Sequence, residues 1–369
     1  MDPNYVSQIW DKLQDKVDRM ASQLGDRCPH AAGADGKYDD MPAAWWTSGF
    51  WPGILWLMHD MNGKPQLREL AWQWDEKIEY VMNTTLELYH DVGFQFLNTA
   101  GMKYWITGDG EARRRGLAAA NYLAGRFNPV GNYIRAWNED LAGWAIVDCS
   151  MNLSLLFWAS EETKDPRFKH IAIKHADTVL QHFIRPDGSC SHIVSFNPET
   201  GERIESIGGQ GYGPDSAWSR GQSWALYGMA NTYRYTKDIR YLDAAKRVAH
   251  YFIASLPDDG IPHWDFRVPN PEDEPRDTSA AAIAASGLLE MAELVPEVES
   301  SFYYRSACHI IHSLTEKYGT WDQPEHEGIL LGGTSHKPAN SNVNVSLIYG
   351  DYFYVEALAK LMGWKRKVY

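Results

Sequence analysis

The sequence predicts an all-α protein built as an (α/α)6 barrel, in which an inner ring of six helices is surrounded by an outer ring of six. Three observations favour this fold. Helical periodicity recurs along the whole chain, short turns recur before charged helices, and the helices between them are rich in small and apolar residues. Barrels of this length fold as one cooperative unit, so the sequence predicts a single domain over residues 1–369.

The first helix shows the periodicity most clearly. Ile9, Leu13, Val17, Met20 and Leu24 recur at spacings of three and four residues, so they line one face of a helix. The remaining helices are bounded by Gly, Pro, Asp and Thr signals. They are expected at 49–61, 66–83, 93–107, 109–127, 147–160, 166–183, 219–236, 239–256, 278–294, 299–317 and 350–362.

A degenerate repeat divides these helices into two kinds. Short turns at 107–109, 163–166 and 236–238 each lead into a helix rich in Lys, Arg and Glu, and 62–65 occupies the corresponding place earlier. The alternate helices contain mainly small and apolar residues, as at 277–282. We therefore expect the charged helices to lie outside and the apolar ones inside.

The unusual residues are concentrated in the connections that lead into the inner helices. In an alternating barrel these connections meet at one mouth, where ligands bind and where helix N-termini favour an anion. The segments concerned are 45–51, 89–94, 146–149, 218–224, 276–279 and 348–352.

The composition restricts the partners of the protein. A net charge of -13 disfavours nucleic acid and anionic membranes, since both require a basic face. The 16 Trp and 20 Tyr suit the apolar faces of sugar rings, although aromatic side chains also pack between helices. Oligomeric state is not indicated by the sequence.

The four cysteines are Cys28, Cys149, Cys190 and Cys308, and their spacing matches neither a C-x-x-C pair nor a zinc site. They are expected to be free thiols. Residues 1–20 are amphipathic and charged, unlike a signal peptide, so we expect a cytoplasmic protein. No metal-binding pattern is present, and we predict neither a metal nor a cofactor.

Four segments carry a resemblance to a known family. Residues 90–94 (HDVGF), 147–152 (VDCSMN), 219–224 (SRGQSW) and 276–280 (RDTSA) resemble glycoside hydrolase family 88, the unsaturated glucuronyl hydrolases, in order and spacing. The resemblance extends from 46–51 to 350–352. It implies a metal-free six-hairpin barrel that removes a terminal 4,5-unsaturated uronate from glycosaminoglycan-type oligosaccharides.

Asp148 matches the family's acid/base position. The resemblance implies that its carboxyl group protonates C4 of the vinyl ether and then, as carboxylate, takes a proton from the water that attacks C5. Apolar neighbours and a nearby Asp91 are expected to raise the pKa of Asp148. Asp91 is expected to position substrate hydroxyls. Without the family, either residue could instead be a helix N-cap.

Further residues match the family's binding positions. Arg220 would neutralise the uronate carboxylate, and His192 and Gln210 would form hydrogen bonds to the sugar ring and to water. The remaining members of the expected substrate site are Trp224, the sugar-stacking Trp46 and Trp137, and His90 beside Asp91. Each of these side chains could alternatively have a purely structural role.

The loop before the last inner helix resembles one that lets some family members accept sulfated disaccharides. In this loop Ser335 and Lys337 could bind a sulfate oxygen directly. The alternative is a solvated loop that ends at Pro338.

Three other functions remain open from the sequence. An unsaturated rhamnogalacturonyl hydrolase would use the same barrel on pectin fragments. An inverting glycosidase would use Asp148 as acid and Asp91 as base, with the carboxyl groups about 6.5 to 9.5 Å apart. A sugar-binding protein would use the aromatic mouth without turnover.

Overall fold

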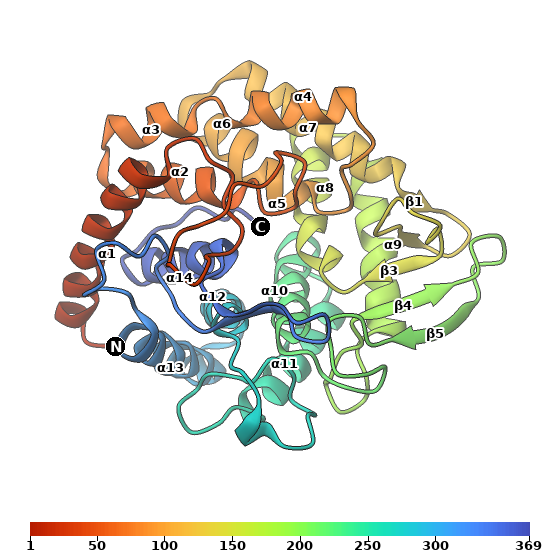
Figure 1. Cartoon of the computed structure of the whole chain (residues 1–369). Helices are drawn as coiled ribbons and strands as arrows, with labels where there is room; N and C mark the ends of the chain where they lie inside the picture. The colour runs from red at the N-terminus through yellow and green to blue at the C-terminus, as the bar shows by residue number, and fades with distance from the viewer.

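A computed structural model describes residues 1–369 and shows two concentric rings of helices (Figure 1). None of the helices combines the length and the apolar character that a membrane span requires. The outer ring contains α1 (Pro3–Leu24), α3 (Pro65–Ala71), α4 (Trp74–Thr84), α7 (Gly110–Gly125), α9 (Pro166–His182), α11 (Ile239–Ala254) and α13 (Glu297–Ser313). The inner ring contains α2 (Phe50–Asn62), α5 (Val92–Phe96), α6 (Met102–Thr107), α8 (Cys149–Thr163), α10 (Ser219–Thr236), α12 (Thr278–Leu294) and α14 (Ile348–Leu361).

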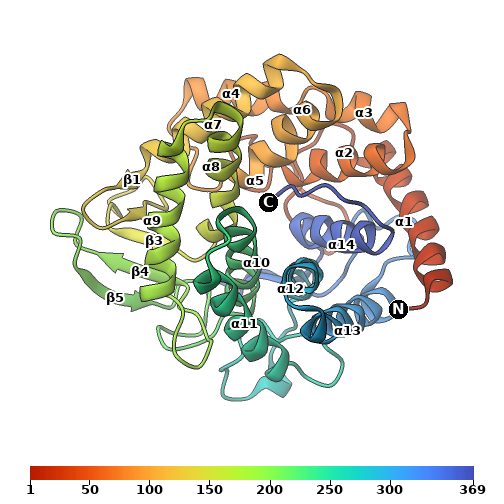
Figure 2. The ribbon, with the colours of Figure 1, turned by 180° about the vertical axis from the view of Figure 1, so that it is seen from behind.

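The inner helices form a closed ring. Helix α2 contacts the segment of α5 and α6, which is followed in the ring by α8, α10, α12 and α14, and α14 packs back against α2 (Figure 2). Each outer helix packs against an inner neighbour, as α11 does against α10 and α13 against α12. The predicted (α/α)6 barrel, with the charged helices outside, is therefore confirmed.

Burial explains the two helix compositions. Every residue of α12 from Thr278 to Met291 is buried, whereas α11 buries only one face. The inner helices also approach one another closely. A Cβ atom on Gly228 of α10 would lie 2.5 Å from the Cβ atom of Ser150 on α8, so this contact requires glycine.

Three of the short turns predicted before the outer helices contain the N-cap of the helix that follows, whereas the turn at 62–65 has no side-chain cap. The carboxylates of Asp109, Asp165 and Asp238 accept hydrogen bonds from the first-turn N–H groups of α7, α9 and α11, at 2.9 to 3.0 Å. These caps satisfy donors that a helix leaves unpaired at its start, and they fix where each outer helix begins.

Two predicted helices are interrupted. The helix expected at 66–83 breaks at Trp72 and Gln73, where the Trp72 carbonyl accepts a hydrogen bond from Nζ of Lys103. The helix expected at 93–107 contains a π-helical turn, η1 (Leu97–Gly101), and the amide of Asn98 within it donates to the Phe94 carbonyl. A similar turn, η3 (Leu314–Tyr318), follows α13, and a short 3-10 turn, η2, spans Pro271–Asp273.

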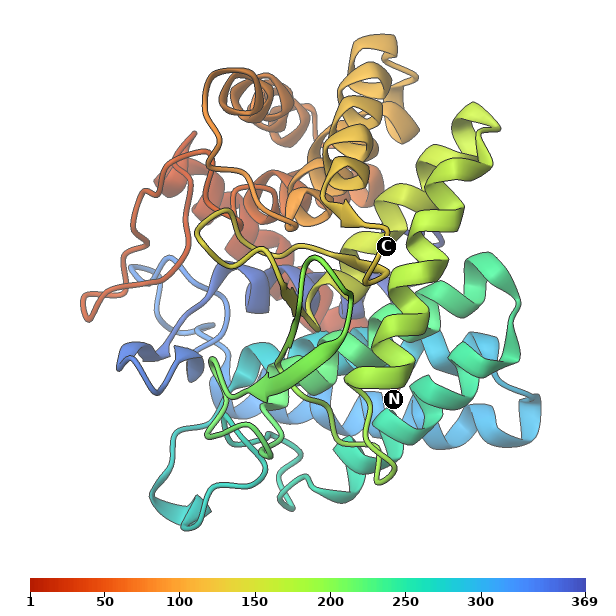
Figure 3. The same cartoon turned by 90° about the vertical axis from the view of Figure 1, so that its right-hand side faces the viewer.

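Three small antiparallel sheets, which the sequence did not predict, lie in the connections. The pairs are β1 (Phe127–Asn128) with β2 (Tyr133–Ile134), and β6 (Gly333–His336) with β7 (Ser341–Val345). The third sheet has the order β3 (Trp144–Ile146), β4 (Ile193–Phe196) and β5 (Arg203–Ile207). Figure 3 views the molecule from the side that carries this three-stranded sheet.

Candidate active site

A pocket with about 400 Å³ of empty volume lies among the connections that precede the inner helices. Its walls come from segments far apart in the sequence, as expected for the mouth of an alternating barrel. The residues that line it are Trp46, His90, Asp91, Trp137, Ile146, Asp148, His192, Gln210 and Arg220. All of these except Ile146 are candidate site residues from the sequence.

The three-stranded sheet places Asp148 beside His192. Ile146 of β3 pairs with Ile193 of β4, and the next N–H along, that of Val147, donates to the His192 carbonyl at 3.0 Å. Asp148 then occupies the N-cap position of α8, but its side chain makes no capping hydrogen bond. The N-cap alternative is therefore wrong for this carboxyl group.

The carboxyl group of Asp148 is largely buried, and one of its oxygens has no partner in the protein. Its side chain is 16% exposed, and the buried Oδ1 atom has no hydrogen-bond partner in the protein. Burial raises the pKa of Asp148 to about 7, and the charge of Arg220 partly opposes this effect. A carboxyl group of this kind carries a proton near neutral pH and can give it to a ligand in the pocket.

Asp91 is a second carboxyl group without a capping role. It precedes α5, its side chain caps no helix N–H, and burial raises its pKa well above the usual range. The negative charge of Asp148 raises the pKa of Asp91 further. The raised pKa of Asp148 agrees with the expectation from the sequence, and burial is its largest cause. The repulsion between the two carboxylates belongs to the pair.

The two histidines of the pocket are neutral. Burial lowers the pKa of His192 to about 3 and holds the pKa of His90 well below its usual value. The backbone N–H of Gln210 lies 3.0 Å from Nδ1 of His192 and the Gly208 carbonyl lies 3.2 Å from the same atom, so these two contacts fit either tautomer of the neutral ring. Nε2 of His90 lies 3.5 Å from Oδ2 of Asp91.

Arg220 is held by protein groups on both of its terminal nitrogens. Nη1 donates to Oδ2 of Asp277 and to the Thr334 carbonyl, both at 2.7 Å. Nη2 donates to Oε1 of Gln210 at 2.5 Å and to the Ser335 carbonyl at 2.6 Å. The expected direct clamp on a carboxylate is thus not available to these nitrogens as they stand, because all four of their hydrogens are used. The bond to Gln210 leaves that residue's Nε2 amide free to donate.

The predicted tryptophans occupy different environments. Trp46 lines the pocket and packs against Tyr349, with ring centroids 4.8 Å apart, and Trp137 lines the pocket beside Trp144. The prediction for Trp224 is corrected, since its side chain is fully buried and does not line the pocket. It lies one turn beyond Arg220 on α10, a spacing that keeps it on the same face but deeper in the barrel.

Comparisons with known proteins identify the family of this chain. The family model for Glycosyl Hydrolase Family 88 matches residues 16–292. The chain belongs to glycoside hydrolase family 88. It is 36% identical to the unsaturated glucuronyl hydrolase of Bacillus sp. strain GL1 over 93% of each chain, and 37% identical to the unsaturated chondroitin disaccharide hydrolase of Streptococcus pneumoniae, over 96% of this chain and 91% of that one.

Solved structures of the family share the whole fold. The crystal structure of the unsaturated glucuronyl hydrolase from Bacillus sp. GL1 superposes with a TM-score of 0.92 at 34% identity, covering 95% of this chain and 96% of the other. A mutant of the Streptococcus agalactiae enzyme in complex with dGlcA-GalNAc6S superposes with a TM-score of 0.86 at 30% identity, covering 98% and 92%.

The predicted sulfate-binding residues of this family 88 chain lie outside the pocket wall. Ser335 is in β6, and its carbonyl group is bound by Arg220. Nζ of Lys337 lies 3.7 Å from Oε2 of Glu274, and both side chains are partly exposed. The β6–β7 hairpin therefore stands beside the pocket, and Arg220 connects it to the pocket wall.

Several residues that support the pocket were not identified from the sequence. The ring of Trp218 packs on His192 with centroids 4.3 Å apart, and the Arg220 guanidinium lies 4.5 Å from the same ring. Asp277 caps α12 and also binds Arg220, and the buried Tyr349 hydroxyl has no hydrogen-bond partner. Asp277 lies within the motif at 276–280 and Trp218 directly precedes the motif at 219–224, which is the signal that would have found them.

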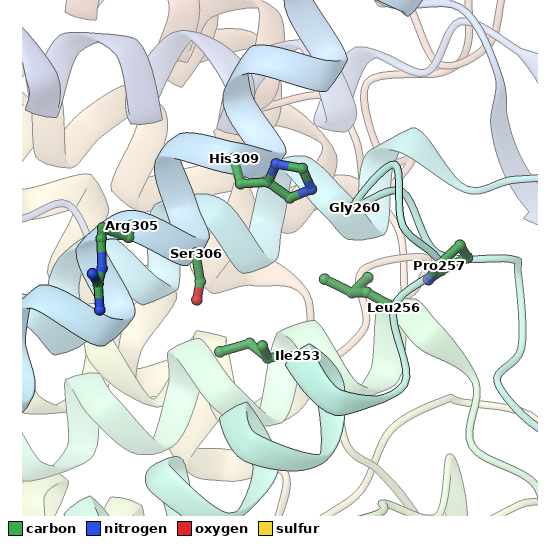
Figure 4. Close-up of a pocket in the computed structure, with 7 residues that line it drawn as sticks. All are labelled: Ile253, Leu256, Pro257, Gly260, Arg305, Ser306 and His309. Carbon is green, nitrogen blue, oxygen red and sulfur yellow. The ribbon is translucent and has the colours of Figure 1, made fainter. Parts of the chain in front are cut away.

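A second hollow lies outside the barrel mouth, between α11 and α13 (Figure 4). Its polar side chains are Arg305, Ser306 and His309, which all lie on α13. It contains no carboxyl group, so it does not share the chemistry of the mouth.

Proposed function

We propose that this chain hydrolyses lyase-generated glycosaminoglycan oligosaccharides and releases their terminal 4,5-unsaturated glucuronic acid. Membership of family 88 makes it a glycoside hydrolase. The observation that carries the specific reaction is the buried carboxyl group of Asp148. It caps no helix N–H group, its Oδ1 atom has no partner in the protein, and burial raises its pKa to about 7. We further propose that residues 1–369 act as one catalytic barrel.

In the first step Asp148 acts as an acid. Its hydroxyl proton is transferred to C4 of the C4=C5 double bond, whose electron pair forms the new C–H bond, and the positive charge at C5 is shared with the ring oxygen. In the tautomer that carries its proton on Nε2, His192 donates a hydrogen bond to the substrate or to a water beside Asp148, whose Oδ1 lies 4.0 Å from Nε2. Asp91 holds substrate hydroxyls beside this centre.

In the second step Asp148 acts as a base. Water attacks C5 and gives one proton to the Asp148 carboxylate, which restores the acid for the next cycle. The hemiketal at C5 then opens to a ketone, and the resulting hemiacetal at C1 releases the neighbouring sugar. The nearby charge of Arg220 stabilises the carboxylate form between the two steps, since it lowers the pKa of Asp148.

The finer preferences also belong to this proposal. We expect a sulfated second sugar to bind beside the β6–β7 hairpin, where Lys337 would exchange its contact with Glu274 for a sulfate oxygen. Lys337→Ala should then lower kcat/KM for a sulfated disaccharide about tenfold and change the unsulfated value less than twofold. Equal effects on both substrates would contradict this preference.

The compartment is a separate proposal. All four cysteines are free and buried, as is common in a reducing compartment, which favours the cytoplasm. Fractionation of the source cells would test it, and recovery of the protein outside the cell would contradict it.

The experiment that tests the reaction is the loss of ultraviolet absorbance of the unsaturated uronate in chondroitin, hyaluronan and heparin disaccharides and in lyase-generated pectin fragments. A saturated glycoside, followed by the release of reducing sugar, is the control. Turnover of an unsaturated disaccharide only, with a ketone product seen by NMR, supports the proposal. Turnover of the saturated glycoside would favour the inverting alternative, and turnover of pectin fragments alone would favour the rhamnogalacturonyl one.

A further inference from the structure

The last residues of the sequence close the barrel at the end opposite the pocket. Nε1 of Trp364 donates to Oδ2 of Asp60 at 2.8 Å, and Nζ of Lys367 donates to Oε2 of Glu290 at 2.6 Å. Asp60 and Glu290 lie near the C-terminal ends of the inner helices α2 and α12, whereas the pocket lies at the N-terminal ends. In Figures 1 and 2 the C-terminal end of the chain lies in the middle of the ring.

Tyr369 fills the space on the barrel axis. Its side chain is 1% exposed, and its ring lies 5.7 Å from Phe353 of α14 and 6.3 Å from Tyr227 of α10, between centroids. The backbone carbonyl of Tyr369 accepts a hydrogen bond from Nη2 of Arg234 on α10. The residue therefore contacts several inner helices at once, and a smaller side chain would leave a cavity there.

The same ring supports the segment that carries Asp91. Tyr369 packs edge-on against Phe94 with centroids 5.8 Å apart, and its hydroxyl accepts a hydrogen bond from Nδ2 of Asn98 at 2.7 Å. Nδ2 of Asn98 also donates to the Phe94 carbonyl at 2.9 Å. Asn98 belongs to the π-helical turn η1, a distortion that is frequent at functional sites. Tyr369 thus contacts both α5 and the turn that follows it.

Phe94 in turn contacts Trp46, a residue of the pocket wall. Its ring lies 6.0 Å from that of Trp46, which lines the pocket, and 4.9 Å from that of Trp224. Its N–H donates to Oδ1 of Asn152 at 2.8 Å, which fixes the start of α5 immediately after Asp91. A continuous set of packed side chains therefore connects Tyr369 to a sugar-stacking wall and to a carboxyl group of the site.

We propose that Tyr369 is a positioning residue for the pocket, acting through Phe94 and Asn98 on Asp91 and Trp46. Tyr369 then supports the pocket, whereas the other contacts of the tail, such as that of Trp364 with Asp60, only close the barrel. A displacement of about 1 Å at a positioned group is sufficient for a large loss of rate. This inference rests on the proposed reaction for its kinetic readout but not for the spectroscopic one described below.

The test compares two substitutions of Tyr369 with one in the same tail. Tyr369→Leu removes the ring, and Tyr369→Phe removes only the acceptor for Asn98. Arg366→Gln is the matched control, because Arg366 bonds to Asp60 and to the Trp105 carbonyl and has no contact with Phe94. It should lower the melting temperature while leaving kcat and KM within twofold.

For Tyr369→Leu we expect kcat/KM to fall at least tenfold, with both a lower kcat and a higher KM. We also expect the carboxyl pKa values of Asp91 and Asp148 to fall by half a unit or more in a ¹³C NMR titration, since water would enter a loosened pocket. Tyr369→Phe should show the same changes at a smaller size. If Tyr369→Leu does not fold, the kinetic constants and carboxyl pKa values of Tyr369→Phe test the inference instead.

A folded variant with wild-type kcat, KM and carboxyl pKa values would overturn the inference, even if its melting temperature were lower. The NMR titration needs no substrate. If the wild type fails to turn over any unsaturated disaccharide but the pKa values still shift in the variants, the proposed reaction fails and the positioning role stands.

Discussion

Nε2 of His192 lies 4.0 Å from Oδ1 of Asp148, and neither atom has a hydrogen-bond partner within the protein. The distance is too long for a direct hydrogen bond. The imidazole of His192 and the carboxyl group of Asp148 therefore face the same small space, where a ligand group or a water can bridge them.

Loss of the His192 donor should slow turnover without unfolding the protein. We expect His192→Ala to lower kcat about 100-fold, a typical loss for one preorganised donor at a reacting centre. His309→Ala, in the hollow outside the mouth, serves as the control and should leave kcat unchanged. Steady-state kinetics with an unsaturated disaccharide would measure both, and a fall of less than threefold for His192→Ala would count against the proposed role.

The pH dependence should follow the proton of Asp148. A raised pKa keeps this carboxyl group protonated below about pH 7, and the acid step requires the proton. We therefore expect kcat/KM to be level below the midpoint and to fall about tenfold per pH unit above about 7. His192 should add no further change to the pH profile in this range, because burial lowers its pKa to about 3. A kcat/KM that continues to rise through pH 8 would contradict this assignment.

Removal of the Arg220 charge should move the midpoint of the pH profile of kcat/KM to higher pH, since this charge lowers the pKa of Asp148. Arg220→Gln should also destabilise the fold by about 3–5 kcal/mol, because Asp277 would be left buried without its cation. The double variant Arg220→Gln/Asp277→Asn is the control. It should recover much of the stability and keep the higher midpoint, whereas recovery of the wild-type midpoint would show that Arg220 acts only through structure.

Asp148→Asn should stabilise the protein at alkaline pH. The pKa of Asp148 is higher in the folded state than its unfolded value of 3.8. The stability that its bound proton contributes is therefore complete below about pH 3.8 and is lost as the pH rises to about 7. We expect the variant to exceed the wild type in unfolding free energy by on the order of 3 kcal/mol at pH 8 and by little at pH 4. Urea unfolding at the two pH values measures the difference. Equal stability at both would mean that Asp148 is not desolvated.

The helical part of the fold could be predicted because its signals are local. Asp109, Asp165 and Asp238 cap outer helices within the turns where the sequence places them, and the all-buried α12 is recognisable from its alanines. The break at Trp72 was missed, and its carbonyl accepts a hydrogen bond from Lys103, which is distant in sequence. Such a tertiary contact overrides helix propensity and leaves no local pattern.

The candidate site could be predicted as a set of residues but not as an arrangement. Motif positions identified Asp148 and His192, yet their relative position depends on strands too short to show an alternating pattern. The four hydrogen bonds that occupy Arg220 come from three separate segments, so its restraint was not visible either. Trp224 was misplaced because a motif indicates which helix face a residue occupies but not how deep it lies.

The measurement that tests the central claim most directly is the ultraviolet assay on unsaturated glycosaminoglycan disaccharides, run with the wild type and Asp148→Asn side by side. We expect the wild type to consume the double bond of at least one disaccharide. We expect Asp148→Asn to bind that disaccharide with similar affinity and to consume it more than 1,000-fold more slowly, since an amide can neither supply nor recover the proton. Turnover by Asp148→Asn within tenfold of the wild type would contradict the assignment of Asp148 as the acid.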